Sequence, residues 1–427
     1  MAGVRGMARR LTWGLADQAV SSLTNFAVGI YVARELGVTA FGIFSLAWVT
    51  YGVVLNISRG LATDPLVVRF SGVAVSVWRH AVTRSAGTAL AVGTAAGAGS
   101  AVLGIAIGGA LGSAFVALGI VLPLLLLQDA WRFAFFAAGQ GRRAFSNDLV
   151  WALAMIPAMI LAAQHDTVVA FLVAWGLSAG VAAVFGCLQV GTLPRWSGVS
   201  SWLREQNDLG PRYLVENVSN SGSSQIRMYG LGAIAGLADV GTVRGAELLM
   251  GPFLAVLMGL SFVAVPEAAR VLRRNPRRLP VFCLVLGGGQ AAGTLLWGVA
   301  LLVLLNDRLG TLLLGSVWAT ASLLIIPATF SITNASFITG AAAGLRALGD
   351  ARRSMRCQLV SSFAYVVGGL GGAFLNGAVG SAWGVASATL FGAVVWWVQL
   401  HAGLRAYQPA PVAEHDLPVP VDESRTT

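Results

Sequence analysis

Four ionisable side chains lie inside stretches that are otherwise apolar. Asp17 lies in LADQAVSSLTNFAVG, Glu216 and Arg227 lie in LVENVSNSGSSQIRMYG, and Arg59 ends the run GVVLNISR. An ionisable group at the centre of a membrane helix costs about 2.5–3.5 kcal/mol on insertion scales, so its side chain should face protein or water. These stretches therefore predict polar helix faces that line a shared interior.

Each of these side chains belongs to a polar stripe at helical spacing. Residues at i, i+4, i+7 and i+11 share one face of an α-helix. The stripes are Asp17, Ser21 and Thr24 with Gln18, Ser22 and Asn25 beside them; Gly52, Asn56, Arg59 and Thr63; and Glu216, Asn220, Ser223 and Arg227. Polar faces of this kind would line a common cavity.

The two arginines are candidates for binding an anionic substrate. Neither has an acidic residue three or four positions away on its own helix, and guanidinium binds phosphate in a bidentate manner. The predicted substrate-binding set is Arg59, Arg227, Asn25, Asn56 and Asn220. An alternative stays open, in which each arginine pairs with an acid on another helix, for instance Arg59 with Asp17.

The acidic residues allow proton or sodium coupling, or partnership with the arginines. Burial raises the pKa of a carboxyl group and a nearby arginine lowers it, so such groups can exchange protons. The predicted ion-coupling or arginine-partner set is Asp17, Glu216, Asp129 and Arg132. Asp129 and Arg132 are three positions apart, so we expect them to neutralise each other. No His or Cys spacing predicts a metal site, and we expect no cofactor.

The elements that must position these residues are transmembrane helices. Only 11% of the 427 residues are charged, and the mean hydropathy is +0.75. A crossing helix needs about 20 mostly apolar residues, and lipid leaves no water for unpaired backbone groups. Twelve such windows are predicted, at residues 12–33, 41–63, 84–107, 113–138, 147–164, 167–189, 212–236, 243–266, 280–305, 320–345, 355–376 and 380–402.

The net charge of +10 is a signal of topology. Every basic residue is arginine, and most arginines fall on one side of the twelve windows; the loops of the other side hold only Arg34, Arg244 and Arg308. By the positive-inside rule, both termini are predicted to be cytoplasmic, in a multi-pass protein of the bacterial cytoplasmic membrane. The arginines therefore do not predict a nucleic-acid partner.

The chain repeats itself weakly. An offset of 199 places Glu216 on Asp17 and Gly241 on Gly42, and an offset of 210 places GDARRSMRCQLV on GQGRRAFSNDLV. We predict two parallel six-helix repeats around a central cavity. The predicted divisions are a cytoplasmic N-terminus (1–11), a first bundle (12–189), a cytoplasmic linker (190–211), a second bundle (212–404) and a disordered cytoplasmic tail (405–427).

Several function classes are disfavoured. Without lysine there is no GxxxxGK phosphate loop, so the chain is not expected to be an ATP-driven pump of that design. The predicted outer loops are mostly under about ten residues, which leaves no room for an extracytoplasmic catalytic domain. We therefore predict a transporter and not an enzyme, with a membrane-embedded enzyme or an envelope-assembly scaffold as the alternative from another class.

The sequence resembles the polysaccharide-type members of the multidrug/oligosaccharidyl-lipid/polysaccharide (MOP) exporter superfamily. The resemblance rests on DQAVSSLTNFAVGIYVARELGVTAFGIFSLA, on the twelve windows, and on the GQGRR and GDARR loops that close the fourth and tenth windows. It implies alternating access by two bundles and flipping of an undecaprenyl-diphosphate-linked oligosaccharide from the inner to the outer leaflet. Met258 stands where the offset of 199 would repeat Arg59, which leaves the charge of the substrate open.

The resemblance also implies the partners. They are a lipid-linked glycan, membrane lipids and proteins of cell-envelope glycan assembly. An ion-coupled multidrug or small-solute antiporter on the same fold is the alternative, and a net acidic cavity would favour it.

Overall fold

The computed structural model describes residues 2–407. Side chains are described within that range except at 2–12, 14, 15, 216, 219, 220, 255, 256, 258–263 and 351. All regular elements of the described range are helical. They are α1 (Ala2–Ser58), η1 (Arg59–Thr63), α2 (Asp64–Phe70), α3 (Val75–Ile107), α4 (Gly109–Ala137), α5 (Gly141–Ala163), α6 (Val168–Val190), η2 (Trp196–Gly198), α7 (Val199–Glu205), α8 (Gly210–Ile234), α9 (Leu237–Arg274), η3 (Pro276–Arg278), α10 (Leu279–Leu304), α11 (Asp307–Leu314), η4 (Gly315–Val317), α12 (Trp318–Ala321), η5 (Ser322–Leu324), α13 (Ile325–Ala347) and α14 (Ala351–Ala406).

The helices account for twelve membrane crossings. Eight segments of the described range are long and apolar enough to cross a membrane, and two of them, residues 16–70 and 352–406, are 55 residues long. Each of these two would extend about 80 Å if straight, against a hydrocarbon core of about 30 Å, so each makes two crossings. The more polar α8 and the long α9 are not among those eight segments, but each is long enough to make one of the two further crossings that the sequence predicts. The predicted fold class is confirmed.

The two long helices bend at residues that leave the helical conformation. α1 bends at Gly37 (φ 74°, ψ 170°), and α14 bends at Asn376 and Gly377 (φ 51°). Glycine adopts positive φ without the steric cost that a Cβ imposes. The chain therefore reverses within a residue or two and returns through the membrane.

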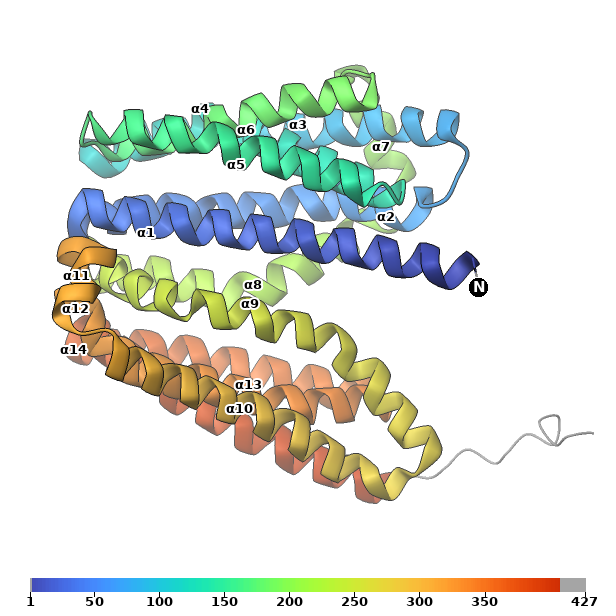
Figure 1. Ribbon diagram of the computed structural model, residues 1–427, viewed down its shortest axis with the longest axis vertical. Coiled ribbons are helices and arrows are strands. Elements are labelled where there is room, and N and C mark those ends of the chain that lie inside the picture. The colour runs from blue at the N-terminus through green and yellow to red at the C-terminus, as the bar shows by residue number, and fades with distance from the viewer. Residues whose placement is uncertain (1, 408–427) are drawn as a thin grey trace, which may run out of the picture.

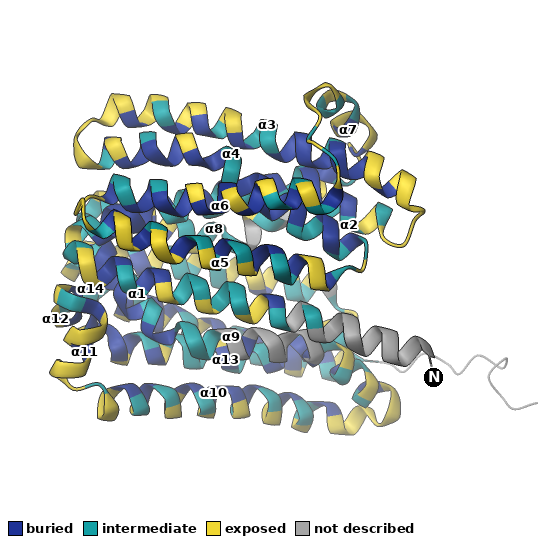
Figure 2. Cartoon of the chain, turned by 45° about the horizontal axis from the view of Figure 1, so that its top comes forward, coloured by how far each residue is buried: buried dark blue, intermediate teal, exposed yellow. Residues whose placement is uncertain are grey.

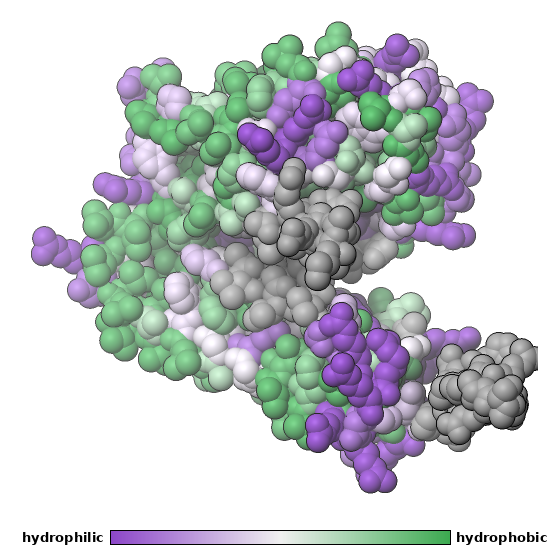
Figure 3. All heavy atoms as spheres, turned by 45° about the vertical axis from the view of Figure 1, so that its right-hand side comes forward, coloured by the Kyte–Doolittle hydropathy of each residue, from purple (hydrophilic) through white to green (hydrophobic). Residues whose placement is uncertain are grey.

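The arrangement divides into two bundles (Figure 1). The first holds α1–α6 and the second holds α8–α14, with α1 lying beside α8 and α9 between them. We call the end with the N-terminus and α7 the linker end, and the opposite end, with the bends at Gly37 and Gly377, the hairpin end. The bundles are close at the hairpin end and diverge toward the linker end. In the space-filling view a notch separates them there, and hydrophilic residues gather on its two sides (Figure 3).

The backbone repeats between the bundles at the offsets that the sequence predicts. Gly37 and Gly236, 199 positions apart, both have positive φ, 74° and 98°. Gly139 and Gly349, 210 apart, each end a helix with the same pair of hydrogen bonds, from the glycine N–H to the carbonyl three residues back and from the next N–H to the carbonyl five residues before it. This is the Schellman end, which needs a left-handed residue. The matched GQGRR and GDARR motifs therefore close equivalent helices.

The linker folds onto the first bundle. Trp202 of α7 is fully buried, and its indole N–H donates to the Leu61 carbonyl at 3.1 Å. Arg84 lies 2.6 Å from the Glu205 carboxylate, and the hydrogen bond lowers the pKa of Glu205 below its ordinary value. The segment predicted as a linker is thus packed onto the first bundle. The predicted domain limits stay a prediction, and the predicted tail lies outside the described residues from 408 onward.

The outer surface suits lipid. Large apolar side chains are exposed along the flanks, with Leu375 at 88% and Phe374 at 77%. Figure 2 shows exposed residues along α3 and α10, while buried residues are frequent along α4 and α6. The polar residues that the sequence singled out lie on α1, η1, α4 and α8.

Candidate functional site

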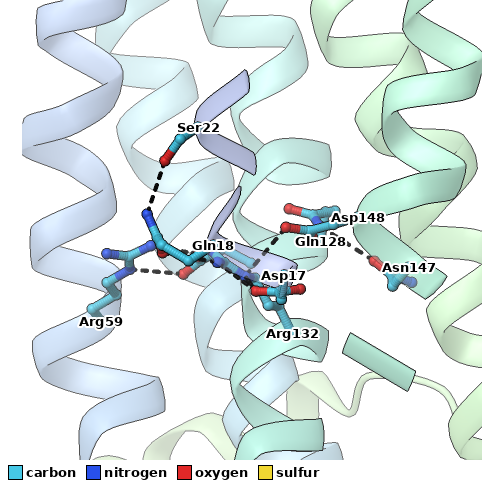
Figure 4. A network of polar contacts seen from close by, with 9 residues as sticks. Asp17, Gln18, Ser22, Arg59, Gln128, Arg132, Asn147 and Asp148 are labelled. Carbon is cyan, nitrogen blue, oxygen red and sulfur yellow. Dashed lines mark hydrogen bonds and ion pairs between the residues drawn. The ribbon is translucent and has the colours of Figure 1, made fainter. Parts of the chain in front are cut away.

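The first site is a buried network inside the first bundle (Figure 4). Asp17 of α1 is fully buried, and Arg132 of α4 donates from Nε to its Oδ2 at 2.7 Å, with Nη2 lying 2.6 Å from the same oxygen. Arg132 also lies 3.3 Å from Oδ2 of Asp148 on α5. One guanidinium therefore serves two carboxylates from two other helices. Oδ1 of Asp17 is buried without a hydrogen-bond partner in the described residues.

The prediction that Asp129 and Arg132 neutralise each other is wrong. Asp129 accepts from Nε and Nη2 of Arg59, at 3.1 and 2.7 Å. Asp129 and Arg132 are three residues apart on α4, but Arg132 contacts α1 and α5, whereas Asp129 contacts Arg59 at the start of η1. Helix spacing fixed which residues share a face, and the neighbouring helices decided the partners.

Arg59 does have an acidic partner on another helix, and it is Asp129 and not Asp17. The bidentate geometry is the strong form of a carboxylate–arginine contact. Arg59 begins η1, a single π-helical turn, and its guanidinium lies 4.8 Å from the centre of the Phe133 ring. π-Helical turns are frequent at functional sites. Arg59 keeps 28% of its side-chain surface exposed, against 8% for Asp129, so the pair is reachable from one side.

Amides complete the first network. Gln128 donates to Oδ1 of Asp148 at 2.8 Å and to Asn147 at 3.3 Å, and Asn147 donates to the Ala182 carbonyl at 2.8 Å. Asp148 was not predicted as a site residue, although an acid one residue into the window 147–164 was a usable signal. The whole network holds three carboxylates, Asp17, Asp129 and Asp148, against two arginines, so its formal charge is −1.

The second site lies inside the second bundle and has the opposite balance. Arg227 of α8 is 5% exposed and donates to Oε1 of Glu247 at 2.7 Å. Arg244, one turn earlier on α9, donates to Oε2 of the same carboxylate at 3.0 Å. Two arginines share one acid, so this cluster has a formal charge of +1. Arg227 also lies over the Tyr365 ring at 5.5 Å.

Arg244 corrects the predicted loop assignment. It lies two turns inside α9 (Leu237–Arg274) and not in a loop. The i, i+3 pair of Arg244 and Glu247 in an apolar window was the signal that sequence reasoning passed over. The side chains of Glu216 and Asn220 lie outside the described residues, so their predicted roles stay predictions.

Polar contacts also join the bundles. Asn56 donates to Ser221 at 2.8 Å, the hydroxyls of Thr50 and Tyr229 lie 2.7 Å apart, and Asn217 donates to Asp64 at 2.7 Å. All three contacts run between the α1–α2 segment and α8. Asn56, predicted to bind substrate, is thus engaged in holding the bundles together in this conformation.

A glycine contact closes the hairpin end with twofold symmetry. A Cβ on Gly42 would lie 1.8 Å from the Leu237 carbonyl oxygen, and a Cβ on Gly241 would lie 2.0 Å from that of Val38. Gly42 and Gly241 are 199 residues apart, and so are Val38 and Leu237. Each bundle therefore makes the same contact to the other, as expected for two repeats about one axis.

Comparisons with known proteins identify the architecture. No family model matches the chain, and no curated protein matches its sequence. Among solved structures, the chain superposes on an inward-facing multidrug resistance MATE family transporter of the MOP superfamily, with a TM-score of 0.69 and 15% identity over 92% of this chain and 98% of that one. It also superposes on the lipid II flippase MurJ in an inward closed conformation, with a TM-score of 0.68 and 9% identity over 92% of this chain and 89% of that one.

The comparison also indicates the conformation. An outward-facing MATE structure of the same superfamily, again 15% identical, gives a TM-score of only 0.53, over 94% of this chain and 96% of that one. The bundles here diverge toward the linker end, which the arginine distribution predicts to be cytoplasmic. The chain has the fold of MOP-superfamily transporters, and it superposes better on the inward-facing MATE structure than on the outward-facing one.

Proposed function

We propose that the protein flips a lipid-linked oligosaccharide or polysaccharide precursor, carried on undecaprenyl diphosphate, from the inner to the outer leaflet by alternating access. Such a substrate has an anionic, polar head and a long hydrocarbon chain. A transporter for it needs a charged interior next to an apolar path that is open to lipid.

One observation carries this proposal: α1 presents both environments. Its inward side holds Asp17 in the charged network. Another side forms, with α5, an apolar groove of about 520 Å³. Leu23, Ile156 and Ile160 line the groove and are 54–65% exposed, so it opens on the flank that faces lipid. The groove can take part of a hydrocarbon chain while the head occupies the space between the bundles.

The +1 cluster of Arg227, Arg244 and Glu247 supports an anionic head. A diphosphate can accept from guanidinium donors that the shared carboxylate leaves free. MurJ, with which the fold is shared, is a lipid II flippase. This likeness adds to the proposal at the level of fold.

A second candidate, an ion-coupled multidrug or small-solute antiporter, is favoured by the −1 network of the first bundle. Buried carboxylates that share one arginine can exchange a proton or bind a cation. The same network can equally couple an ion gradient to flipping. The charges of the two sites thus support two different roles. The −1 network of the first bundle would couple transport to an ion gradient, and the +1 cluster of the second bundle would bind the anionic head of the substrate.

Deletion of the gene tests the proposal in cells. In a strain without a redundant exporter, we expect a lipid-linked glycan to accumulate in the cytoplasmic leaflet and the surface glycan to be lost. Unchanged surface glycan with increased sensitivity to cationic drugs would instead establish the antiporter.

A further inference from the structure

A small pocket, mostly apolar but with three polar side chains in its wall, lies where the two bundles meet, close to the hairpin end. We call it the interface pocket. It has a volume of about 120 Å³ and is lined by Asn25, Phe26, Gly29, Phe41, Phe44, Ser45, Trp48, Arg244 and Leu248. Both limbs of α1 and the start of α9 therefore contribute walls. With the bundles open at the linker end, the pocket lies at the closed end of the space between them.

The Ser45 hydroxyl is buried in this pocket without a partner. Its residue is 1% exposed, and Oγ has no hydrogen bond in the described part of the chain. A buried unsatisfied hydroxyl costs about 1–3 kcal/mol, and a helical serine usually avoids that cost by bonding a carbonyl of the preceding turn. A ligand in the pocket can supply the missing partner.

Arg244 brings positive charge with unused donors. Among the described residues it makes one hydrogen bond, from Nη1 to Glu247. Nε and Nη2 are left, and Glu247 is already shared with Arg227. The amide of Asn25 likewise has no hydrogen bond to a described residue. Three donor groups, one of them cationic, thus converge on one pocket.

The pocket occupies corresponding positions of the two repeats. Ser45 and Arg244 are 199 residues apart, as are Trp48 and Glu247. The symmetric backbone contact of Gly42 and Gly241 lies one turn away on each helix. The two repeats have therefore diverged at this position. The first repeat has the hydroxyl of Ser45 and the indole of Trp48, and the second repeat has the guanidinium of Arg244. Trp48 is held in place by stacking on Trp175, with ring centres 4.9 Å apart.

We propose that the interface pocket binds one oxyanionic group, a phosphate or a carboxylate, of the transported head. The proposal rests on the proposed function for the identity of the substrate, and on the pocket alone for the chemistry. The volume of about 120 Å³ leaves room for a single such group. The oxyanionic group can come from the diphosphate of the lipid head or from the carboxylate of an acidic sugar.

Binding to the purified full chain separates the two sources. Inorganic pyrophosphate, glucuronate and neutral glucose are titrated against the protein in detergent, with calorimetry and thermal stability as readouts. We expect an oxyanion to bind and to raise the melting temperature, and glucose to do neither. A response to pyrophosphate assigns the pocket to the lipid head, and a response to glucuronate assigns it to an acidic sugar. No binding of either anion would overturn the proposal.

Variants locate the binding. Arg244→Gln should weaken oxyanion binding roughly 10- to 150-fold, because it removes a charge-assisted contact. Arg308→Gln, on an exposed position of α11, is the matched control and should bind as wild type does. Binding by Arg244→Gln at wild-type strength contradicts the proposal.

Ser45→Ala gives a readout that a structural role would not produce. Without ligand, the variant should be at least as stable as wild type, because no hydrogen bond is lost. With the oxyanion present, its gain in melting temperature should be smaller than that of wild type. A ligand-free Ser45→Ala protein that is clearly less stable would show that the hydroxyl has a structural partner, against the proposal.

Failure of the pocket and failure of the flippase are distinguishable. If wild type binds the oxyanion and Arg244→Gln does not, oxyanion binding by the pocket is supported. This holds even if the reconstituted protein flips no lipid-linked glycan, in which case only the proposed function fails. If wild type flips such a glycan and all variants keep wild-type binding and flipping, the pocket proposal fails and the function stands.

Discussion

At the scale of single residues, Arg59, Arg132 and Arg227 pair with acids on other helices, whereas Arg244 pairs with Glu247 along α9. Arg59 is paired with Asp129, Arg132 with Asp17 and Asp148, and Arg227 with Glu247. Removing one partner of a buried pair strands the other, whereas removing both costs much less. The stability of single and double variants therefore reports which pairs are structural.

The Arg59 pair gives the first prediction. Arg59→Gln should lower the free energy of unfolding by about 3–5 kcal/mol, because the buried Asp129 carboxylate loses its bidentate partner. Adding Asp129→Asn should restore much of the loss. Thermal unfolding in detergent measures both. Rescue by Asp17→Asn in place of Asp129→Asn would mean that the pairing is misassigned.

Arg227 should behave differently, because its partner keeps a second arginine. After Arg227→Gln, Glu247 is still bonded to Arg244, so the melting temperature should fall less than in Arg59→Gln. Transport should nevertheless weaken, with substrate affinity reduced roughly 10- to 150-fold if the guanidinium contacts a phosphate. A normal transport rate at limiting substrate would remove Arg227 from the binding site.

At the scale of helices, the contact of Gly42 with α9 decides how the bundles meet. Gly42→Ala would place a methyl group 1.8 Å from a carbonyl oxygen, so the hairpin end must open or the backbone must shift. We expect a loss of about 1–3 kcal/mol from overpacking. The control is Gly99→Ala, on an exposed part of α3 with nothing within 4 Å, which should gain about 0.5–1 kcal/mol.

The same variant should change the conformational equilibrium. Spin labels at 204 and 274, one on the linker end of each bundle, report the separation of the bundles in a chain without its native cysteines. In Gly42→Ala the population with widely separated linker ends should fall relative to wild type. An unchanged distance distribution would show that this contact does not hold the linker ends apart.

The sequence predicted where the helices lie along the chain better than it predicted which helices pack together. Apolar length and periodicity depend on each helix alone, so the twelve windows correspond to the crossings of α1–α14. The breaks between the first two windows and between the last two were predicted as loops. In the structure they are sharp bends at Gly37 and Gly377, and the apolar pattern does not distinguish a bend from a short loop. Partners such as Asp129 for Arg59 depend on which helices pack together and on their rotation. No periodicity within one helix contains that information, and so Asp148, Ser45 and Arg244 were missed.

At the scale of the whole molecule, the arginine distribution predicts which end faces the cytoplasm. Single cysteines at 110, 165 and 376 should react with impermeant thiol reagents from outside the cell, and one at 275 should not. All four positions are exposed, whereas the nearby Ala378 is buried and would be a poor probe. The reverse pattern of labelling would contradict the predicted orientation and reverse the proposed direction of flipping.

The measurement that tests the central claim most directly is flipping by the purified protein. The protein is reconstituted into vesicles that contain a fluorescent sugar on undecaprenyl diphosphate, and a membrane-impermeant quencher reports the fraction of label in the outer leaflet. We predict that wild type exposes nearly all of the label, while Arg227→Gln exposes it much more slowly. Quenching that stops at about half, as in protein-free vesicles, in the presence of a proton or sodium gradient as well as without one, would contradict the account.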